Sequence, residues 1–222
     1  MADEGNGDDA VIVALGGNLP GAWASIAEVL EAALAGLDAV GLKLVARSSL
    51  WRSAAWPDPS QPEYLNAVAL VGTGLAPRDV LAALQGLERR FGRVRSTANA
   101  ARVLDLDLVA YGGLVIEDEA GGLILPHPRA AERGFVMGPL AEIAPGWRHP
   151  VSGERAIHLA RHVTIGTDAA PLLSPPSSMG EHPGGKRGRP AQPDEQRQQS
   201  VFRAPRGLSG PLGHLPIADG ED

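Results

Sequence analysis

The chain of 222 residues carries 26 acidic and 20 basic side chains, a formal net charge of −6, and 44% of its residues are hydrophobic. This length suits one domain with a sizeable core, and the negative charge argues against a general polyanion binder, which needs clustered Lys and Arg. The absence of cysteine excludes disulfides, thiolate metal sites and cysteine nucleophiles, and it fits a reducing cytoplasm.

The first residues, MADEGNGDD, are acidic and lack the basic and apolar regions of a secretory signal. No later run approaches the roughly 20 apolar residues that a membrane span requires. We therefore expect an unexported, cytoplasmic protein with no membrane partner.

Periodic apolar residues predict six elements in the first half of the chain. In order they are a strand (10–15), a helix (21–40), a strand (41–53), a strand (64–73), a helix (76–92) and a strand (103–111). The order β-α-β-β-α-β is typical of ferredoxin-like α+β folds. Beyond this core we expect a hairpin at Gly112 and Gly113 and helices within 125–145 and 153–163.

The composition changes near Gly166. Residues 166–222 hold nine of the 19 prolines and nine of the 28 glycines, and such a segment buries too little apolar surface to offset its ordering entropy. We predict one domain over 9–165 and a disordered tail over 166–222. The tail contains GGKRGRPAQ, similar to a minor-groove hook, but such a match arises easily by chance in this composition, so we expect no nucleic-acid partner.

Two carboxylates interrupt the apolar strand VLDLDLVAY. Asp105 and Asp107 lie two residues apart and so share a face, about 6.6 Å from each other, where they repel by about 2 kcal/mol at an effective dielectric near 20. Mg²⁺ is commonly held by one or two carboxylates and substrate phosphates, so the pair is a candidate metal site. An edge strand whose outer face meets water is the alternative.

Basic side chains cluster in the segments around this pair. They are Arg93 and Arg95 after the second helix, Arg102 before the aspartates, and His127, Arg129 and Arg133 in PHPRAAERGF. Arg matches phosphate oxygens with two parallel hydrogen bonds. The set therefore favours a polyphosphate with its metal over scattered surface ion pairs.

Six ordered motifs resemble the 6-hydroxymethyl-7,8-dihydropterin pyrophosphokinase family. They are ALGGNLP, SSLWRS, QPEYLNAV, LERRFGRVR, RVLDLDLVAYGG and LPHPRAAERGFVMGPLAEIAP, and they cover most of residues 10–150. The resemblance implies a folate-pathway enzyme that transfers pyrophosphate from ATP to a pterin alcohol. It also implies a Mg²⁺-dependent cytoplasmic monomer whose partners are these two small molecules.

The resemblance also implies roles for individual residues. Asp105 and Asp107 would hold two Mg²⁺ ions, and with Arg93 and Arg102 they would form the catalytic set. The other implied ATP contacts are Glu88, Arg95, His127 and Arg133, and the implied pterin contacts are Ser53, Tyr64, Asn66 and Phe135. Taken singly, Tyr64 and Phe135 could be core aromatics and Asn66 a turn cap.

The chain departs from the family pattern in the loop before the aspartates. Where many members have Arg-Trp-Gly-Pro-Arg, this chain has TANAARVLD, without the tryptophan and one arginine; Trp51 or Trp56 are candidates for the missing stacking surface. Gly17, Ala54 and Pro128 also replace residue types common in the family. Two other functions therefore stay open: a binding module that has lost transfer and uses its tail for recruitment, and a nucleotidyltransferase acting on another alcohol.

Overall fold

The computed structural model describes residues 10–93, 100–118 and 122–172, all within one compact unit, Met1–Pro176. The strands of its main sheet are β1 (Val11–Gly17), β2 (Lys43–Arg47), β3 (Trp51–Ser53), β4 (Tyr64–Gly72), β5 (Asp105–Tyr111) and β8 (Ala170–Pro171). Their order is β5-β1-β4-β3-β8, with β2 also paired to β4, and all these pairings are antiparallel. The prediction of an α+β protein is confirmed, with an antiparallel sheet.

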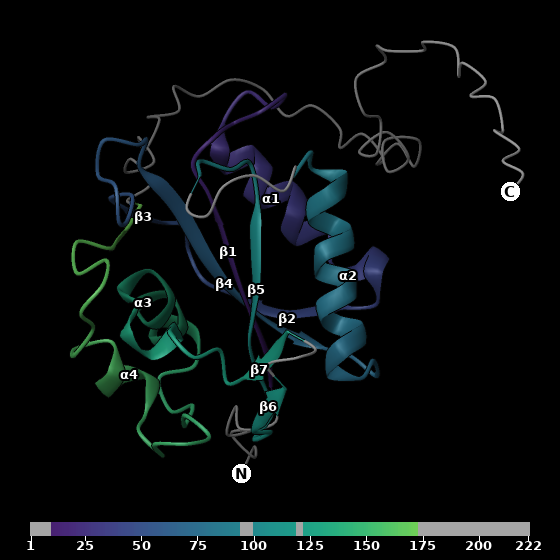
Figure 1. Cartoon of the computed structure of the whole chain (residues 1–222), viewed down its shortest axis with the longest axis vertical. Coiled ribbons are helices and arrows are strands. Elements are labelled where there is room, and N and C mark those ends of the chain that lie inside the picture. Colours follow the sequence, from purple (N-terminus) through teal and green to yellow (C-terminus); the bar gives the residue numbers. More distant parts are fainter. Residues whose placement is uncertain (1–9, 94–99, 119–121, 173–222) are drawn as a thin grey trace, which may run out of the picture. The chain divides into compact units, whose positions relative to one another are not determined.

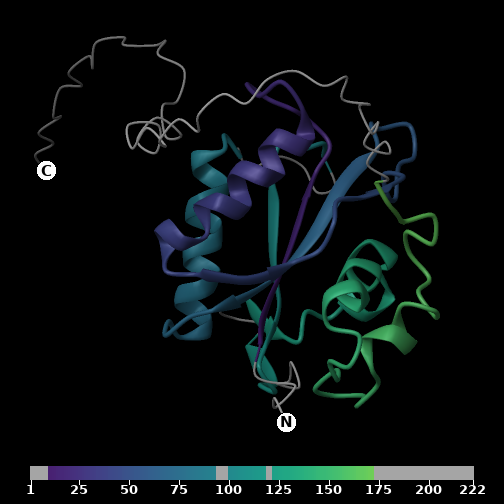
Figure 2. The same cartoon turned by 180° about the vertical axis from the view of Figure 1, so that it is seen from behind.

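Helices cover both faces of the sheet (Figures 1 and 2). Helices α1 (Ile26–Gly36) and α2 (Pro77–Arg90) lie on one face, and α3 (Gly134–Ile143) and α4 (Ala156–Leu159) lie on the other. Successive residues of β1 enter different cores: Val13 packs with α1 and α2, whereas Ile12 packs with α3 and α4. Burial on both faces explains why this strand is a continuous apolar run. None of the helices in the described ranges has the length and apolar character needed to span a bilayer.

Local sequence signals account for the start of each long helix. Ser25 caps α1 by accepting a hydrogen bond from the Glu28 amide at 3.2 Å, while the Glu28 carboxylate accepts one from the Ala24 amide at 3.2 Å. This pair resembles a capping box, except that the carboxylate binds the amide of the residue before the N-cap. Helix α2 begins at Pro77, which has no amide hydrogen to leave unpaired, and buries Val80, Leu84 and Leu87 along one stripe.

The single strand predicted over 41–53 is two strands, β2 and β3, both paired with β4. Ser48 lies between them and is buried. Its amide donates to the Val68 carbonyl at 2.9 Å, and its hydroxyl accepts from the Val68 amide at 3.0 Å. The serine hydroxyl thus replaces a backbone acceptor at the break between β2 and β3. An alternating sequence pattern does not reveal such a break.

The segment after β5 differs from the prediction. Instead of a hairpin turning at Gly112 and Gly113, β6 (Ile116–Asp118) pairs with β7 (Leu123–Leu125) in a separate two-stranded sheet. The helix expected within 125–145 is a short 3-10 turn, Ala130–Glu132, followed by α3, and α4 occupies four residues of 153–163.

Composition places the segment from Gly166 to Leu172 in the predicted tail. In the structure it includes β8, where Ala170 pairs with Arg52 and Pro171 with Trp51 of β3. The predicted disorder over the rest of the tail concerns residues 173–222, which lie outside the described ranges, so it stays a prediction.

Replacing Glu142 with alanine should destabilise the fold at neutral pH. Its carboxylate joins α3 to the β2–β3 edge by accepting hydrogen bonds from the Ser49 amide, the Ser49 hydroxyl and the Trp51 indole, each at 2.8 Å. Partial burial would raise the pKa of Glu142, but the hydrogen bonds from Trp51 and Ser49 outweigh it and lower the pKa. We expect a loss of about 1 kcal/mol, reduced by the exposure of the site.

The sign of the pKa shift fixes how this loss depends on pH. A carboxyl with a lowered folded-state pKa stabilises the fold above its unfolded pKa of about 4.3, and this contribution disappears as pH falls through the folded value. Urea unfolding at pH 7 and below pH 4 should show the gap between wild type and Glu142→Ala closing at low pH. A gap that stays constant with pH would contradict a role for the carboxylate charge.

Candidate active site

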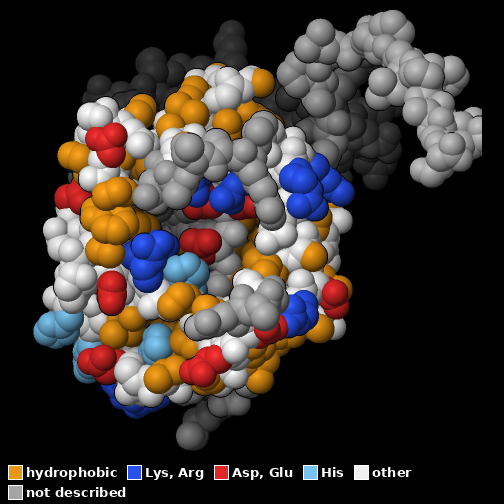
Figure 3. Space-filling view, viewed as in Figure 1, with side chains coloured by type: hydrophobic (Ala, Val, Ile, Leu, Met, Phe, Trp, Pro, Cys, Tyr) orange, Lys and Arg blue, Asp and Glu red, His pale blue; other side chains and the backbone are white. Residues whose placement is uncertain are grey.

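A cleft of about 250 Å³ opens at the end of β1, β4 and β5 (Figure 3). Its walls come from the main sheet, from the β3–β4 loop and from the start of α3. It is lined by Ala14, Leu15, Gly16, Ser53, Ala54, Trp56, Tyr64, Asn66, Arg93, Arg102, Asp105, Asp107, His127, Arg129, Arg133, Phe135 and Val136. Ten of the twelve predicted site residues are among them; Glu88 and Arg95 are not.

The two aspartates lie on the cleft side of β5, as the alternating pattern predicts. Asp105 and Asp107 have side chains 27% and 37% exposed, whereas Leu106 and Leu108 are buried in the core beneath α1 and α2. The paired carboxylates therefore face a solvent-accessible cavity and the intervening leucines hold the strand in place.

Two arginines neutralise Asp105. The Nη1 atom of Arg93 lies 2.6 Å from Oδ1, and the Nη1 atom of Arg102 lies 3.0 Å from Oδ2. Burial alone would lower the pKa of Arg93, but the carboxylates of Asp105 and Glu88 outweigh it and raise the pKa. Arg93 therefore stays positively charged beside the aspartate.

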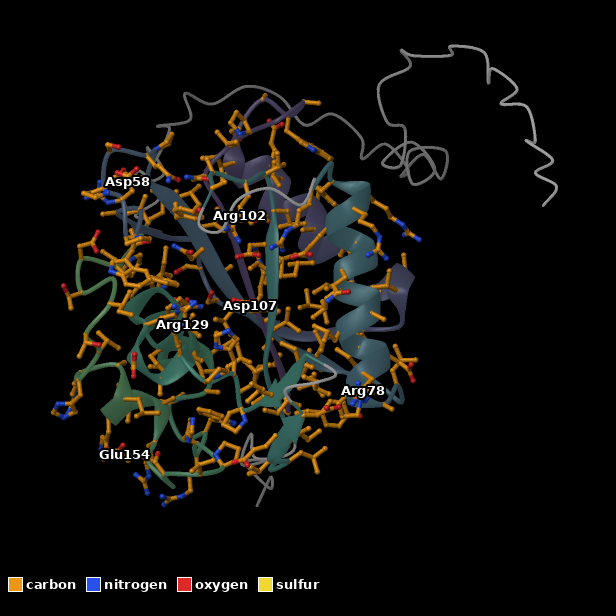
Figure 4. The ribbon with its side chains drawn as sticks, in the orientation of Figure 1. Asp58, Arg78, Arg102, Asp107, Arg129 and Glu154 are labelled. Carbon is orange, nitrogen blue, oxygen red and sulfur yellow. The ribbon has the colours of Figure 1, made fainter. Side chains whose placement is uncertain are left out.

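Asp107 faces a second basic wall (Figure 4). Its Oδ2 atom lies 3.5 Å from Nη1 of Arg133 and 4.0 Å from Nε2 of His127. Burial, together with the charge of Asp105, raises the pKa of Asp107, and burial lowers the pKa of His127. His127 accepts a hydrogen bond at Nδ1 from the Arg129 amide at 3.2 Å, which turns Nε2 toward the aspartate.

The backbone around Arg102 explains how its side chain is aimed. Asn18 accepts a hydrogen bond from the Arg102 amide at 2.8 Å, and the Asn18 and Leu19 amides donate to the Arg102 carbonyl at 3.0 and 3.1 Å. A Cβ atom at Gly17 would lie 2.3 Å from the Val103 carbonyl oxygen. The glycine at this departure from the family pattern is therefore required for the close approach of the two segments.

Glu88 lies beneath the cleft and is buried. Its Oε1 atom accepts a hydrogen bond from the Leu106 amide, between the two aspartates, at 2.7 Å, and it pairs with Arg93. Burial raises the pKa of Glu88, against the hydrogen bond from Leu106 and the charge of Arg93. Glu88 thus braces both β5 and Arg93 from behind, a position that the sequence pattern did not distinguish from direct contact with a ligand.

The other half of the cleft is less charged. Asn66 and Ser53 are buried and joined by a hydrogen bond from the Asn66 amide nitrogen to the Ser53 hydroxyl at 3.1 Å. Tyr64 is half-buried, and burial raises the pKa of its phenol. The Phe135 ring lies 5.6 Å from the Arg133 guanidinium carbon. These groups offer aromatic surface and an ordered amide to a flat polar ligand.

The remaining candidates are distributed as follows. Arg95 lies outside the described residues. Trp51 packs against Gly138, where a Cβ atom would lie 2.5 Å from its ring, and its indole donates to Glu142. Trp56, 48% exposed, lines the cleft and remains a candidate stacking surface.

Arg129 lines the cleft, as its membership of the basic set around the aspartates predicts, although the family resemblance implied no individual role for it. Its place in the basic motif PHPRAAERGF was the available signal.

The donor set fits Mg²⁺ that is completed by a substrate. Among the described residues no group of three or more His, Cys, Asp or Glu side chains could hold a metal ion. Two carboxylates in an open cleft with surrounding arginines instead match the usual Mg²⁺ arrangement, in which phosphates and water supply the other ligands.

Comparison with known proteins agrees with this geometry. The model of the family described as 7,8-dihydro-6-hydroxymethylpterin-pyrophosphokinase (HPPK) matches residues 12–145. A 2-amino-4-hydroxy-6-hydroxymethyldihydropteridine pyrophosphokinase of Synechocystis is 39% identical over 153 residues, covering 68% of this chain and 75% of that protein. The protein of the same name in Pseudomonas aeruginosa is 40% identical over 141 residues, covering 63% of this chain and 83% of the relative.

Solved structures share the fold at low sequence identity. A Plasmodium falciparum HPPK-DHPS structure is similar with a TM-score of 0.51 and 13% identity over 68% of this chain. An HPPK-DHPS in complex with substrates has a TM-score of 0.56 and 12% identity over 74% of this chain. The chain spans 43% and 47% of those two proteins, less than half of each.

Glu88→Ala should lower the free energy of unfolding more than Glu88→Gln does. Alanine leaves the buried Leu106 amide without an acceptor and removes one partner of Arg93, a loss of about 3 kcal/mol. Glutamine keeps an acceptor oxygen for the Leu106 amide. Urea unfolding of both variants measures the difference, and equal stabilities would contradict the bracing role of the Glu88 oxygen.

Proposed function

The chain belongs to the 7,8-dihydro-6-hydroxymethylpterin-pyrophosphokinase family, and we propose that its cleft transfers pyrophosphate from ATP to 6-hydroxymethyl-7,8-dihydropterin. The products are AMP and the pterin diphosphate, an intermediate of folate synthesis. The observation that carries the proposal is the pair Asp105 and Asp107 on one strand face, set between two walls of basic side chains.

The charged half of the cleft is the proposed ATP side. Asp105 and Asp107 would hold two Mg²⁺ ions, which neutralise charge on the transferring group and orient the phosphates when bound. Arg93, Arg102 and Arg133 are paired with these aspartates in the structure. Metal ions at the carboxylates would free their guanidinium groups for phosphate oxygens.

Arg133 and Arg129 support a phosphate ligand on the α3 side of the cleft. Arg133 lines the cleft with its Nη1 atom 3.5 Å from Asp107, and its buried Nε atom has no hydrogen-bond partner among the described residues. Arg129 lines the same wall beside His127. Both could therefore contact the phosphates without breaking a backbone interaction.

The less charged half is the proposed pterin side. Tyr64 and Phe135 would contact the faces of the ring, and Asn66, oriented by Ser53, would bind its polar edge. The hydroxymethyl oxygen of the pterin would then attack the β-phosphorus in line. The bond from that phosphorus to the α–β bridging oxygen breaks, AMP leaves with the oxygen, and the hydroxyl proton passes to water.

Positioning and charge stabilisation can account for this reaction, since phosphoryl-type transfer through a loose transition state asks little of a general base. The alternative of a binding module without transfer is not favoured, because the chain retains both aspartates and their basic partners.

Three finer expectations belong to the same proposal. The strand order β5-β1-β4-β3, with α1 and α2 on one face, supports a ferredoxin-like core. ATP as co-substrate and the lack of cysteine support a cytoplasmic location. We also propose a monomer, as the resemblance to the family implies.

Pterin-dependent release of AMP tests the proposed reaction directly. Purified protein with ATP, Mg²⁺ and 6-hydroxymethyl-7,8-dihydropterin should form AMP, and a chelator should abolish its formation. Asp107→Asn removes a metal ligand without changing side-chain size, so turnover should fall by about 1000-fold or more. Asp79→Asn, an exposed change in the first turn of α2, is the control; turnover retained in Asp107→Asn would refute the metal role.

Arg129→Gln should weaken ATP binding while leaving the chemistry intact. Losing one charged hydrogen bond to phosphate corresponds to an increase of about tenfold in KM for ATP, with kcat and KM for the pterin unchanged. Arg161→Gln on the exposed surface after α4 is the matched control. Identical KM values for ATP in the two variants would exclude Arg129 from the phosphate site.

A further inference from the structure

A segment beyond the family match runs along the pterin side of the cleft. We call Val163–Leu172 the strap; it follows α4 and ends with β8, whereas the family model ends at residue 145. The strap contacts two walls of the cleft that are far apart in sequence, the start of α3 and the β3–β4 loop.

On the α3 side the strap is held by backbone hydrogen bonds. The amides of Thr164 and Ile165 both donate to the Glu132 carbonyl at 2.9 Å, and the Gly134 amide donates to the Ile165 carbonyl at 2.7 Å. These bonds enclose Arg133, which faces Asp107 in the cleft. The strap is therefore fixed at the point where α3 begins.

Gly166 then passes directly against the Phe135 ring. Its φ angle is +64°, and a Cβ atom there would lie 2.5 Å from Cδ1 of Phe135. A Cβ atom at Gly134 would lie 2.2 Å from the Gly166 carbonyl oxygen. The two glycines allow a contact so close that the strap limits where the ring of Phe135 can lie.

On the opposite wall the strap holds the residue after β3. Asp168 accepts a hydrogen bond at Oδ2 from the Ala54 amide at 2.6 Å, and the Leu172 amide donates to the Leu50 carbonyl at 2.6 Å. Ala54 and its neighbour Ser53 line the cleft. Asp168 thus fixes the first residue of a proline-rich loop that also carries Trp56.

We propose that the strap sets the separation of the two walls of the pterin pocket, and that Asp168 is its positioning residue, acting through the Ala54 amide. The inference rests on the proposed function. Phe135 and Ala54 are joined through a single ten-residue segment hydrogen-bonded at both ends, so releasing one end lets the loop sample wider positions. Binding of the pterin must then order the loop, and the entropy cost of that ordering weakens binding and raises KM for the pterin.

Three variants test the positioning role by steady-state kinetics. Asp168→Ala removes the acceptor and should raise KM for the pterin about fivefold, the effect of one lost hydrogen bond, while KM for ATP stays unchanged. Asp168→Asn keeps an acceptor oxygen and should restore the wild-type KM. Asp38→Ala is the matched control, since Asp38 is also exposed and accepts a backbone hydrogen bond, from the Leu44 amide at 3.1 Å.

Each result has a definite meaning. A rise in both KM values, a rise equal to that of Asp38→Ala, or no rescue by Asp168→Asn would overturn the proposal. Gly166→Ala, which presses on Phe135 from the other end of the strap, should also raise KM for the pterin alone.

Hydrogen exchange separates this inference from the proposed reaction. The Ala54 amide should exchange faster in Asp168→Ala than in wild type or Asp168→Asn, and this readout needs no substrate. Wild-type protein that forms no AMP would refute the proposed function, whereas an unchanged Ala54 exchange rate in Asp168→Ala would refute the strap.

Discussion

The placement of two like charges on one face of β5 is the constraint around which the cleft is built. Asp105 and Asp107 are close enough to repel, and each is compensated by basic groups from other elements: Arg93 and Arg102 at the first, Arg133 and His127 at the second. These basic side chains relieve the repulsion in the free protein. They also suit a metal polyphosphate, because they can bind phosphate oxygens once metal ions occupy the carboxylates.

Strand pairing in the sheet fixes the relative positions of the side chains that line the cleft. β1 is hydrogen-bonded to β4 on one side and β5 on the other, so Tyr64 and Asn66 lie across one central strand from Asp105 and Asp107. Gly16 pairs with both Asn66 and Asp105, and a Cβ atom there would lie 3.1 Å from the Asn66 side-chain oxygen. A small residue at the centre keeps the two halves of the cleft continuous.

The supporting contacts lie mostly behind or beside the cleft. Glu88 holds the Leu106 amide from beneath β5, Asn18 holds the Arg102 backbone, and the strap joins α3 to the β3–β4 loop. Each places a polar side chain where a backbone group would otherwise lack a partner. Rigid placement of a few groups is what a reaction governed by positioning and charge requires.

Much of this protein was readable from local pattern. Alternation placed Asp105 and Asp107 opposite Leu106 and Leu108, and helical periodicity placed α1 and α2, because both depend on the fixed geometry of a strand or a helix. The basic motifs around the aspartates identified the charged half of the cleft, whereas Ser53, Tyr64, Asn66 and Phe135 were implied only by the resemblance to the family.

Only the tertiary structure decided which elements meet. Glu88 looked like a ligand contact but is buried behind β5, Trp51 packs on Gly138 instead of lining the cleft, and Asp168 reaches Ala54 across 114 positions of sequence. Composition predicts no structure for the segment that contains β8. The strand forms nevertheless, because pairing with β3 supplies the hydrogen-bond partners that the segment lacks locally. Such contacts depend on long-range packing, which neither spacing nor composition encodes.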